Sequence, residues 1–261
     1  MCSSDLGPER RPAAGEPIGE VIAVRISDGS ELWRHVLVDP ESSPVLADGI
    51  CYIGSGVNGN ALVALRAIGT DAELAARGQQ RELWRVPTPY PATGAVTLAG
   101  DAVLIGCGRG DFVYADPNPA GLVLAVDRRS GVELWRADVP DAVLGAIAVH
   151  GGRAIVPVRN GEVLCLDLAA KGAVLWRARP ADGAPLLAGP AVTPTRVYAL
   201  STNGFLAVLD AADGRVLESH YLNSPDRPGE LQLAVSAPVV ADGMVFVGSE
   251  TGGFHAFAGG R

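Results

Sequence analysis

Long apolar runs and clusters of basic residues are both absent from this chain of 261 residues. No apolar segment approaches the roughly 18 to 20 residues that a helix needs to cross a bilayer, so direct insertion into a membrane is not expected. The formal net charge is −8, and the lysine and arginine side chains are dispersed along the sequence. This charge pattern argues against nucleic acids or anionic membranes as partners.

Motifs that would indicate a metal site or a catalytic centre are also missing. The four cysteines, Cys2, Cys51, Cys107 and Cys165, include no Cys-x-x-Cys motif and no adjacent pair, which leaves neither a zinc knuckle nor a redox motif. The four histidines include no pair four residues apart and no carboxylate at a metal-ligand spacing. No nucleophile motif such as Gly-x-Ser-x-Gly is present. These absences favour a protein that is not an enzyme, without catalytic or metal-ligating residues.

Turn-forming and apolar residues are abundant instead. The chain has 33 glycines and 19 prolines, and 48% of its residues are hydrophobic, which is typical of a large core with many turns. All four tryptophans lie in the same tripeptide, Leu-Trp-Arg, and a degenerate fifth copy lacks the ring. The copies are Trp33, Trp84, Trp135, Trp176 and Leu217–Glu218, at intervals of 51, 51, 41 and 42 residues. A period near 40 residues with strand-like content indicates β-propeller blades.

Each repeat has the pattern of four short strands. An alternating apolar segment, such as residues 122–126, precedes each tryptophan copy, and an earlier pair of apolar segments is joined by Asp-Gly at residues 48–49 and 242–243. Asp-Gly between such segments is a hairpin signal. A glycine four residues before the tryptophan position indicates a second tight turn, because glycine adopts positive φ freely; these glycines are Gly29, Gly131, Gly172 and Gly214. One repeat is therefore predicted to be an antiparallel meander of strands A to D, which is a propeller blade.

The repeats account for almost the whole chain. Strands C and D are expected near residues 19–38, four whole blades through about residue 222, and strands A, B and C from about residue 236 to 257. The predicted fold is an all-β propeller of 21 strands with partial blades at both ends, in an incomplete or unusually small ring. Thr70 followed by Glu73 is a capping box, which predicts one short helix between strands C and D of the second repeat.

Residues 1–15 stand apart from this pattern. The segment Cys-Ser-Ser-Asp-Leu at positions 2–6 is what one reading frame of a common short-read sequencing adapter encodes. We hypothesise that residues 1–15 are a non-native or disordered leader on an N-terminally truncated gene fragment. A lipoprotein start is the alternative, but the apolar segment that must precede a lipidated cysteine is missing. Residues 16–261 are interpreted as a single propeller domain.

The best-defined repeat resembles a known family. Residues 125–135 read Ala-Val-Asp-Arg-Arg-Ser-Gly-Val-Glu-Leu-Trp, which is similar to the tryptophan-docking repeat of pyrroloquinoline-quinone-type (PQQ-like) propellers. The resemblance covers about residues 19–257. It implies that each tryptophan docks onto the next blade, and that the protein is exported to the periplasm or the cell envelope.

The resemblance does not choose one function, because the family includes quinoprotein dehydrogenases, the envelope assembly factor BamB and sensor domains. Its dehydrogenases hold the quinone between a tryptophan and a disulfide of adjacent cysteines, with a calcium ion and an aspartate base. This sequence has no adjacent cysteines and no tryptophan outside the docking positions. PQQ and calcium are therefore expected only if the chain is a fragment of an alcohol dehydrogenase of this kind, and otherwise no cofactor is expected.

Long loops on one rim mark the expected binding surface, because B-to-C and D-to-A connections lie on the same side of a propeller. The largest B-to-C insertion spans residues 106–121, whereas the equivalent turn of the next repeat spans only 159–162. A second long polar loop spans residues 223–232. Guanidinium, carboxylate and aromatic groups on these loops suit a protein or peptide partner; the candidate binding residues are Arg109, Asp111, Tyr114, Asp116, Asn118, Arg159, Asp226, Arg227 and Glu230. A calcium site from Asp111, Asp116 and Asn118 is an alternative that lacks the regular spacing of calcium loops.

These features favour a non-catalytic, monomeric scaffold that presents this rim to a protein or an extended peptide, as in assembly of the cell envelope. Two other functions stay open from the sequence. One is a fragment of a PQQ-dependent dehydrogenase, and the other is the sensor domain of a membrane-anchored kinase.

Overall fold

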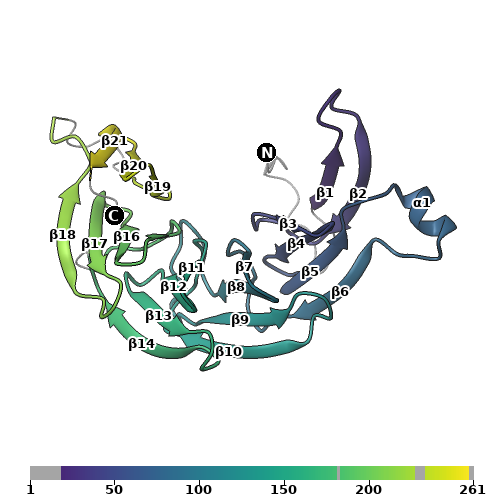
Figure 1. Cartoon of the computed structure of the whole chain (residues 1–261), viewed down its shortest axis with the longest axis horizontal. Helices are drawn as coiled ribbons and strands as arrows, with labels where there is room; N and C mark the ends of the chain where they lie inside the picture. Colours follow the sequence, from purple (N-terminus) through teal and green to yellow (C-terminus); the bar gives the residue numbers. More distant parts are fainter. Residues whose placement is uncertain (1–18, 181–182, 227–232, 259–261) are drawn as a thin grey trace.

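Six antiparallel sheets follow one another around an arc (Figure 1). The computed structural model describes residues 19–180, 183–226 and 233–258. The first sheet has two strands, the next four have four strands each, and the last has three. The predicted all-β propeller, with 21 strands and a partial blade at each end, is confirmed. The predicted leader, residues 1–15, lies outside the described residues.

The strand bounds follow the predicted repeats. The first sheet holds β1 (Gly19–Val24) and β2 (Glu31–Leu37), and the second holds β3 (Val45–Ala47), β4 (Ile50–Ser55), β5 (Ala61–Arg66) and β6 (Glu82–Pro87). The third holds β7 (Thr97–Ala99), β8 (Ala102–Gly108), β9 (Gly121–Asp127) and β10 (Glu133–Val139), and the fourth holds β11 (Ala148–His150), β12 (Arg153–Pro157), β13 (Val163–Asp167) and β14 (Ala173–Ala178). The fifth holds β15 (Ala191–Val192), β16 (Arg196–Leu200), β17 (Phe205–Asp210) and β18 (Val216–Tyr221), and the sixth holds β19 (Val239–Ala241), β20 (Met244–Ser249) and β21 (Gly253–Ala258).

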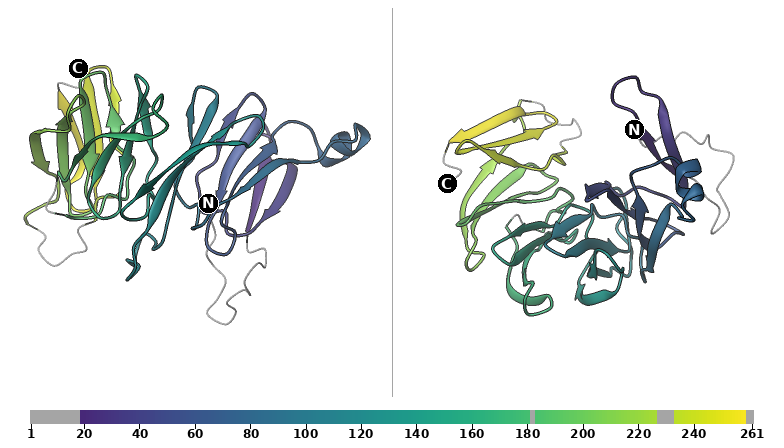
Figure 2. Two further views of the ribbon diagram at one scale, coloured as in Figure 1. Left: turned by 90° about the horizontal axis from the view of Figure 1, so that it is seen from below. Right: turned by 45° about the vertical axis from the view of Figure 1, so that its right-hand side comes forward.

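Each four-stranded sheet is a meander that runs from the inner side of the arc to its outer side (Figures 1 and 2). Neighbouring inner strands touch, as β11 does with β7 and with β15. Apolar side chains of adjacent sheets meet between them: Leu62 of β5 packs in one cluster with Ile105 of β8 and Leu124 of β9. A sheet with a neighbour on each side is therefore covered on both faces. Its strands β5, β9 and β13, one in each of three such sheets, are buried on both sides. This explains why these strands read as continuous apolar runs.

Four tryptophan side chains join the first five sheets, each sheet to the next one along the chain. The strand register places Trp33, Trp84, Trp135 and Trp176 at the same position of β2, β6, β10 and β14, opposite Ala23, Ala64, Ala125 and Cys165. The indole Nε1 of Trp84 donates to the backbone O of Arg128 at 3.3 Å, and Nε1 of Trp176 donates to the backbone O of Ala211 at 3.2 Å. Both acceptors lie in the turn between the third and fourth strands of the following sheet. These two rings therefore combine packing across the sheet interface with a hydrogen bond.

A glycine lies under three of the rings. Gly131, Gly172 and Gly214 have φ of 71°, 80° and 76°, which confirms the predicted tight turns. A Cβ at these positions would approach the rings of Trp84, Trp135 and Trp176 to 2.8, 2.7 and 2.5 Å respectively. Glycine is thus required twice, for the backbone conformation and for the close approach of the indole.

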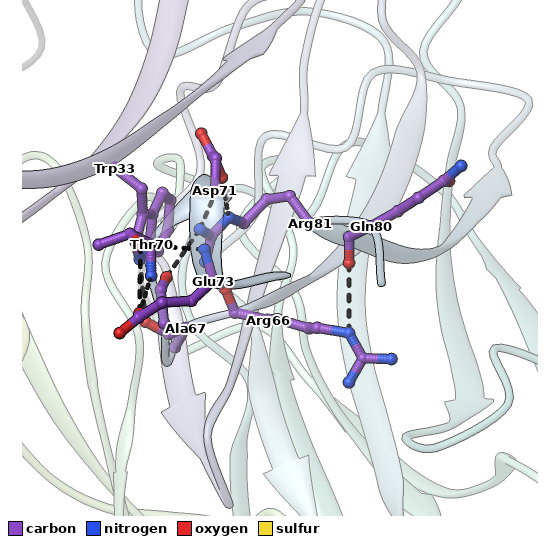
Figure 3. Close-up of polar contacts among 9 residues, drawn as sticks. Trp33, Arg66, Ala67, Thr70, Asp71, Glu73, Gln80 and Arg81 are labelled. Carbon is purple, nitrogen blue, oxygen red and sulfur yellow. Dashed lines mark hydrogen bonds and ion pairs between the residues drawn. The ribbon is translucent and has the colours of Figure 1, made fainter. Parts of the chain in front are cut away.

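The first tryptophan meets an arginine instead (Figure 3). The turn between β5 and β6 carries α1 (Asp71–Ala76), which begins with the predicted capping box of Thr70 and Glu73. The Arg81 guanidinium carbon lies 4.4 Å from the centre of the Trp33 ring, and Nε1 of Trp33 donates to the backbone O of Ala67 at 2.9 Å. A cation over an indole face is an attractive arrangement.

The same arginine ties α1 to the sheet. Arg81 donates to the backbone O of Arg66 at 2.6 Å and of Gly69 at 2.8 Å, and to the Asp71 carboxylate at 2.6 Å. Its side chain is only 7% exposed. The helix itself projects from the outer side of the arc (Figures 1 and 2). Within the described ranges, no helix is both long enough and apolar enough to span a membrane.

We expect Gly214→Ala to destabilise the protein more than Gly29→Ala. Both glycines have positive φ, so each alanine costs about 1–2 kcal/mol through backbone strain. An alanine Cβ at position 214 would also collide with the Trp176 ring, whereas at position 29 it would meet nothing within 4 Å. That collision adds about 1–3 kcal/mol at position 214 alone. Chemical denaturation of both variants measures the difference, and equal losses would contradict a steric role for Gly214.

We expect Arg81→Ala to release α1 without unfolding the sheets. The substitution removes the ion pair with Asp71 and the bonds to two carbonyl groups, each worth about 1.5–3 kcal/mol for a charged donor. Trypsin should then cut after Arg77, at the end of the helix, several-fold faster than in the unchanged protein. Arg66→Ala is the matched control, because that side chain is exposed and donates only to Gln80 O at 3.2 Å. Equal rates of cleavage in the two variants would show that Arg81 does not hold the helix.

Candidate partner-binding rim

Backbone hydrogen bonds connect the loops on one side of the arc. In each case a connection between two sheets is joined to a loop that follows the second strand of a sheet. The pairs are Ala92 N to Ser55 O, Gly108 N to Pro91 O, Arg159 N to Ala142 O, Thr202 N to Pro185 O and Ala234 N to Thr202 O, at 2.9 to 3.2 Å. The loops predicted to carry the binding residues therefore form one continuous surface, which we call the rim.

The largest rim loop, residues 109–120 between β8 and β9, is closed by its own hydrogen bonds. Arg109 N donates to Ala120 O at 2.8 Å at its base, and Asp111 N donates to Tyr114 O at 3.0 Å. The Asp111 carboxylate accepts from the backbone N of Val113 at 2.7 Å and of Tyr114 at 2.6 Å. An aspartate that bonds its own following backbone stabilises a tight turn. Asp111 thus shapes the loop from within.

Arg159 fixes this loop to the next sheet. Its Nε donates to the backbone O of Asp111 at 2.9 Å, from the turn between β12 and β13. The residue is only 8% exposed. The sequence predicts Arg159 as a contact for a partner, whereas the structure buries it as a support for the loop. The planar guanidinium already holds the loop in one conformation. The loop therefore needs little rearrangement when it meets a ligand.

The tip of the loop presents three large side chains to solvent. Phe112 is 49% exposed, and Val113 and Tyr114 are each 74% exposed; we call residues 112–114 the aromatic tip. At the base of the loop, the guanidinium carbon of Arg109 lies 5.4 Å from the centre of the Tyr90 ring. The sequence singled out Arg109 and Tyr114. Phe112, Val113 and the Tyr90 partner were missed, although an apolar triplet inside a long polar loop was a usable signal.

The other predicted residues that the structure describes, Asp116, Asn118 and Asp226, make local hydrogen bonds. Asp116 accepts from Asn118 N at 2.7 Å in a local turn. Asp226 lies after β18, where its backbone N donates to Ser224 Oγ at 3.3 Å. Arg227 and Glu230 lie outside the described residues. Within the described ranges, no three acidic, histidine or cysteine side chains gather as they would around a metal ion.

Carboxylates from the neighbouring loops make this part of the rim acidic. Glu41 and Asp39 lie between β2 and β3. Burial raises the pKa of Glu41, and the charges of Asp39 and Asp111 raise it further. Burial also raises the pKa of Asp39, partly offset by the hydrogen bond from the Val57 N–H. This grouping could not be predicted from the sequence, because residues 39 and 111 belong to different repeats.

The raised pKa of Glu41 predicts a dependence of stability on pH. Below the pKa of the unfolded chain, about 4.3 for glutamate, the carboxyl group is protonated in both states and adds no penalty. As the pH rises through the higher pKa of the folded protein, ionisation penalises the folded state. Glu41→Gln should therefore raise the melting temperature at pH 7, and this gain should disappear as the pH falls below about 4.

Glu31→Gln is the control with the opposite sign. The hydrogen bond from Arg34 lowers the pKa of Glu31, so this substitution should lower the melting temperature at pH 7. That loss should shrink as the pH falls through the lowered pKa of Glu31. Melting curves at several pH values test both variants, and a gain from Glu41→Gln that persisted at low pH would contradict the electrostatic interpretation.

The fold and the rim define a class of protein, a β-propeller of the PQQ-like type with tryptophan-docked blades. Residues 70–260 match the family model described as outer membrane protein assembly factor BamB. The chain belongs to this family, which confirms the resemblance seen in its repeats.

Curated relatives carry the same description. The outer membrane protein assembly factor BamB of Nitrosomonas eutropha is 27% identical over 237 residues, which are 87% of this chain and 52% of that protein. BamB of Yersinia pestis is 30% identical over 172 residues, which are 57% of this chain and 42% of that protein. The chain thus spans about half the length of the curated relatives it matches.

Solved structures share the fold. The crystal structure of BamB from Moraxella catarrhalis has a TM-score of 0.65 and 19% identity, and the match covers 85% of this chain and 62% of that chain. The quinohemoprotein alcohol dehydrogenase ADHIIG from Pseudomonas putida HK5 also has a TM-score of 0.65, with 16% identity, covering 90% of this chain and 48% of that chain. At these identities the likeness concerns the fold alone, and function has to be argued from the site.

Proposed function

We propose that this chain is a non-catalytic scaffold in outer membrane protein assembly, and that it binds a protein partner through the rim. Its membership of the BamB family supports the assembly role. The aromatic tip is the observation that carries the choice of surface, because it exposes two aromatic rings and a valine on a loop with an internally bonded backbone.

Rigidity of the loop favours binding. A loop that is already ordered loses less conformational entropy when a partner docks, and here Asp111 and Arg159 order the backbone under the tip. Aromatic side chains are enriched in the buried centres of protein interfaces. The carboxylates of Glu41 and Asp111 beside the tip would complement a partner segment that combines apolar and basic side chains.

The residues that the structure describes do not fit a quinone site. In the described residues, Cys51, Cys107 and Cys165 are free and buried in three different sheets, and burial raises the pKa of the Cys107 thiol to about 12. All four tryptophan rings are occupied by contacts between sheets. These placements favour the scaffold over the alternative, a fragment of a PQQ-dependent dehydrogenase, and no reaction step is assigned.

Location and assembly state are part of the proposal. The relatives are named as outer membrane assembly factors, so we place this chain in the cell envelope, on the periplasmic side. We further propose that it works as a monomer without a cofactor. The rim can then engage its partner without a second copy of the chain.

A photo-reactive residue at the aromatic tip tests the proposal. We expect p-benzoylphenylalanine in place of Tyr114 to form a covalent adduct with an outer membrane assembly protein in a Gram-negative envelope. The same residue in place of Glu133, exposed on the outer strand β10 of the same sheet, should not form it. Mass spectrometry of the adduct identifies the partner.

A second variant connects the adduct to the shape of the loop. Asp111→Ala removes the two hydrogen bonds that order the tip. The loop would then lose conformational entropy when the partner binds, so the yield of the position-114 adduct should fall several-fold. Glu133→Ala should leave the yield unchanged. The proposal fails if positions 114 and 133 give the same adducts, or if position 114 gives none.

A further inference from the structure

The fifth sheet has a glutamate where the other sheets have their tryptophan. In the strand register Glu218 of β18 lies opposite Val208 of β17. This is the pairing that Trp84 makes with Ala64 and Trp135 makes with Ala125. The degenerate fifth repeat of the sequence is therefore a docking position without its indole ring.

A hollow lies beside this position, between the fifth and sixth sheets. Its volume is about 350 Å³, and its lining includes Leu206, Val208 and Glu218 of the fifth sheet and Val245 and Phe257 of the sixth. Ligand pockets of proteins start at roughly 300 Å³, so the hollow has room for a small ring system. None of these residues belongs to the rim loops.

Tyr198 forms part of one wall of the hollow, where its ring could stack on an aromatic ligand. Tyr198 of the fifth sheet pairs with Val208, as Tyr52 of the second sheet pairs with Ala64. In that earlier sheet the Tyr52 ring lies 5.8 Å from the Trp84 ring at an angle of 38°. Tyr198 is 4% exposed and also lines the hollow. Its ring is thus placed for a stacking contact that this chain fills with tryptophan elsewhere.

Charged groups surround the same wall. Burial raises the pKa of Tyr198, and the charges of Arg196 and Glu218 act on it in opposite directions. Glu218 Oε2 lies 3.3 Å from Nε2 of His220, and the Glu218 side chain is 67% exposed. An ionised carboxylate only accepts hydrogen bonds. A ring that entered the hollow would therefore be favoured if it carried an N–H group.

We propose that this hollow is a binding pocket for a flat aromatic group with an N–H donor, of the size of an indole. The ring would pack against Tyr198 and between Val208 and Val245, with its N–H group directed to Glu218. The ring would make the kind of contact between sheets that the four tryptophans make, but it would be supplied from outside, with a carboxylate in place of a backbone carbonyl as the acceptor. The ring could come from a free heteroaromatic compound or from a tryptophan side chain of another polypeptide.

Methyl spectra with indole as the probe test the pocket. Titration of the protein should shift the methyl signals of Val208 and Val245, which line the hollow, and leave the methyl signals of Val113 on the rim unchanged. Glu218→Trp supplies the missing ring and should weaken indole binding by about tenfold or more.

Ser219→Trp is the matched control. It adds the same ring to the neighbouring position of β18, which points to the opposite face because strand residues alternate, so binding should persist. Tyr198→Leu removes the stacking ring and should weaken binding several-fold, which keeps the test open if Glu218→Trp does not fold. Absent shifts at Val208 and Val245, or equal binding by the Glu218→Trp protein, would overturn the proposal.

Two further probes distinguish the sources of the ring. Tighter binding of N-acetyl-tryptophanamide than of 3-methylindole would identify a polypeptide side chain as the natural ligand. The reverse order would identify a free compound, and either order supports the pocket. Loss of the adduct at Tyr114 would not affect these results, because the rim and the hollow share no residues.

Discussion

The burial of an indole ring on the turn of the following sheet is the contact on which this architecture depends. A sheet of three or four short strands with two apolar faces is not stable alone. Its neighbours must therefore be held in register, and each tryptophan does this with a ring contact worth roughly 2–3 kcal/mol. Trp33, Trp84 and Trp176 add a hydrogen bond across the interface. A slip of one residue would turn the ring to the other face of its strand.

The chain meets this constraint in three ways. Three interfaces use a glycine of positive φ, which lets the indole approach the backbone. At the interface of Trp33, Arg81 takes the place of the glycine, and the turn between β5 and β6 can be longer and contain α1. The fifth sheet places Glu218 where the ring would be and keeps a hollow beside Tyr198. Positions where the docking motif departs from the repeat are thus where a ligand or an inserted segment can be accommodated while the strands of the sheet stay in place.

Most of the fold could be predicted from the sequence, because the strands recur in every repeat, and the turn glycine and the tryptophan each recur in four of the five copies of the motif. Gly131 illustrates this, since its place four residues before Trp135 already indicated a tight turn. Contacts between repeats were not visible in the same way. Arg81 reaches Trp33 across 48 positions, and Asp39 and Asp111 come together only because neighbouring loops share a rim. Such contacts follow from the curvature of the arc and not from local pattern. The direction of an individual side chain, as for the buried Arg159, was likewise open until the loop conformation was known.

The docking contact also gives the arc a polarity. The tryptophan of one sheet always reaches forward to the turn of the next, so each sheet needs its successor to bury its ring, but not its predecessor. Opening the arc at an interface would expose an indole on the sheet before the break and only a glycine turn on the sheet after it. Damage to one sheet should therefore spread toward the amino terminus more readily than toward the carboxyl terminus. The two sides of a break would also differ as targets for proteases and chaperones, which bind exposed aromatic side chains.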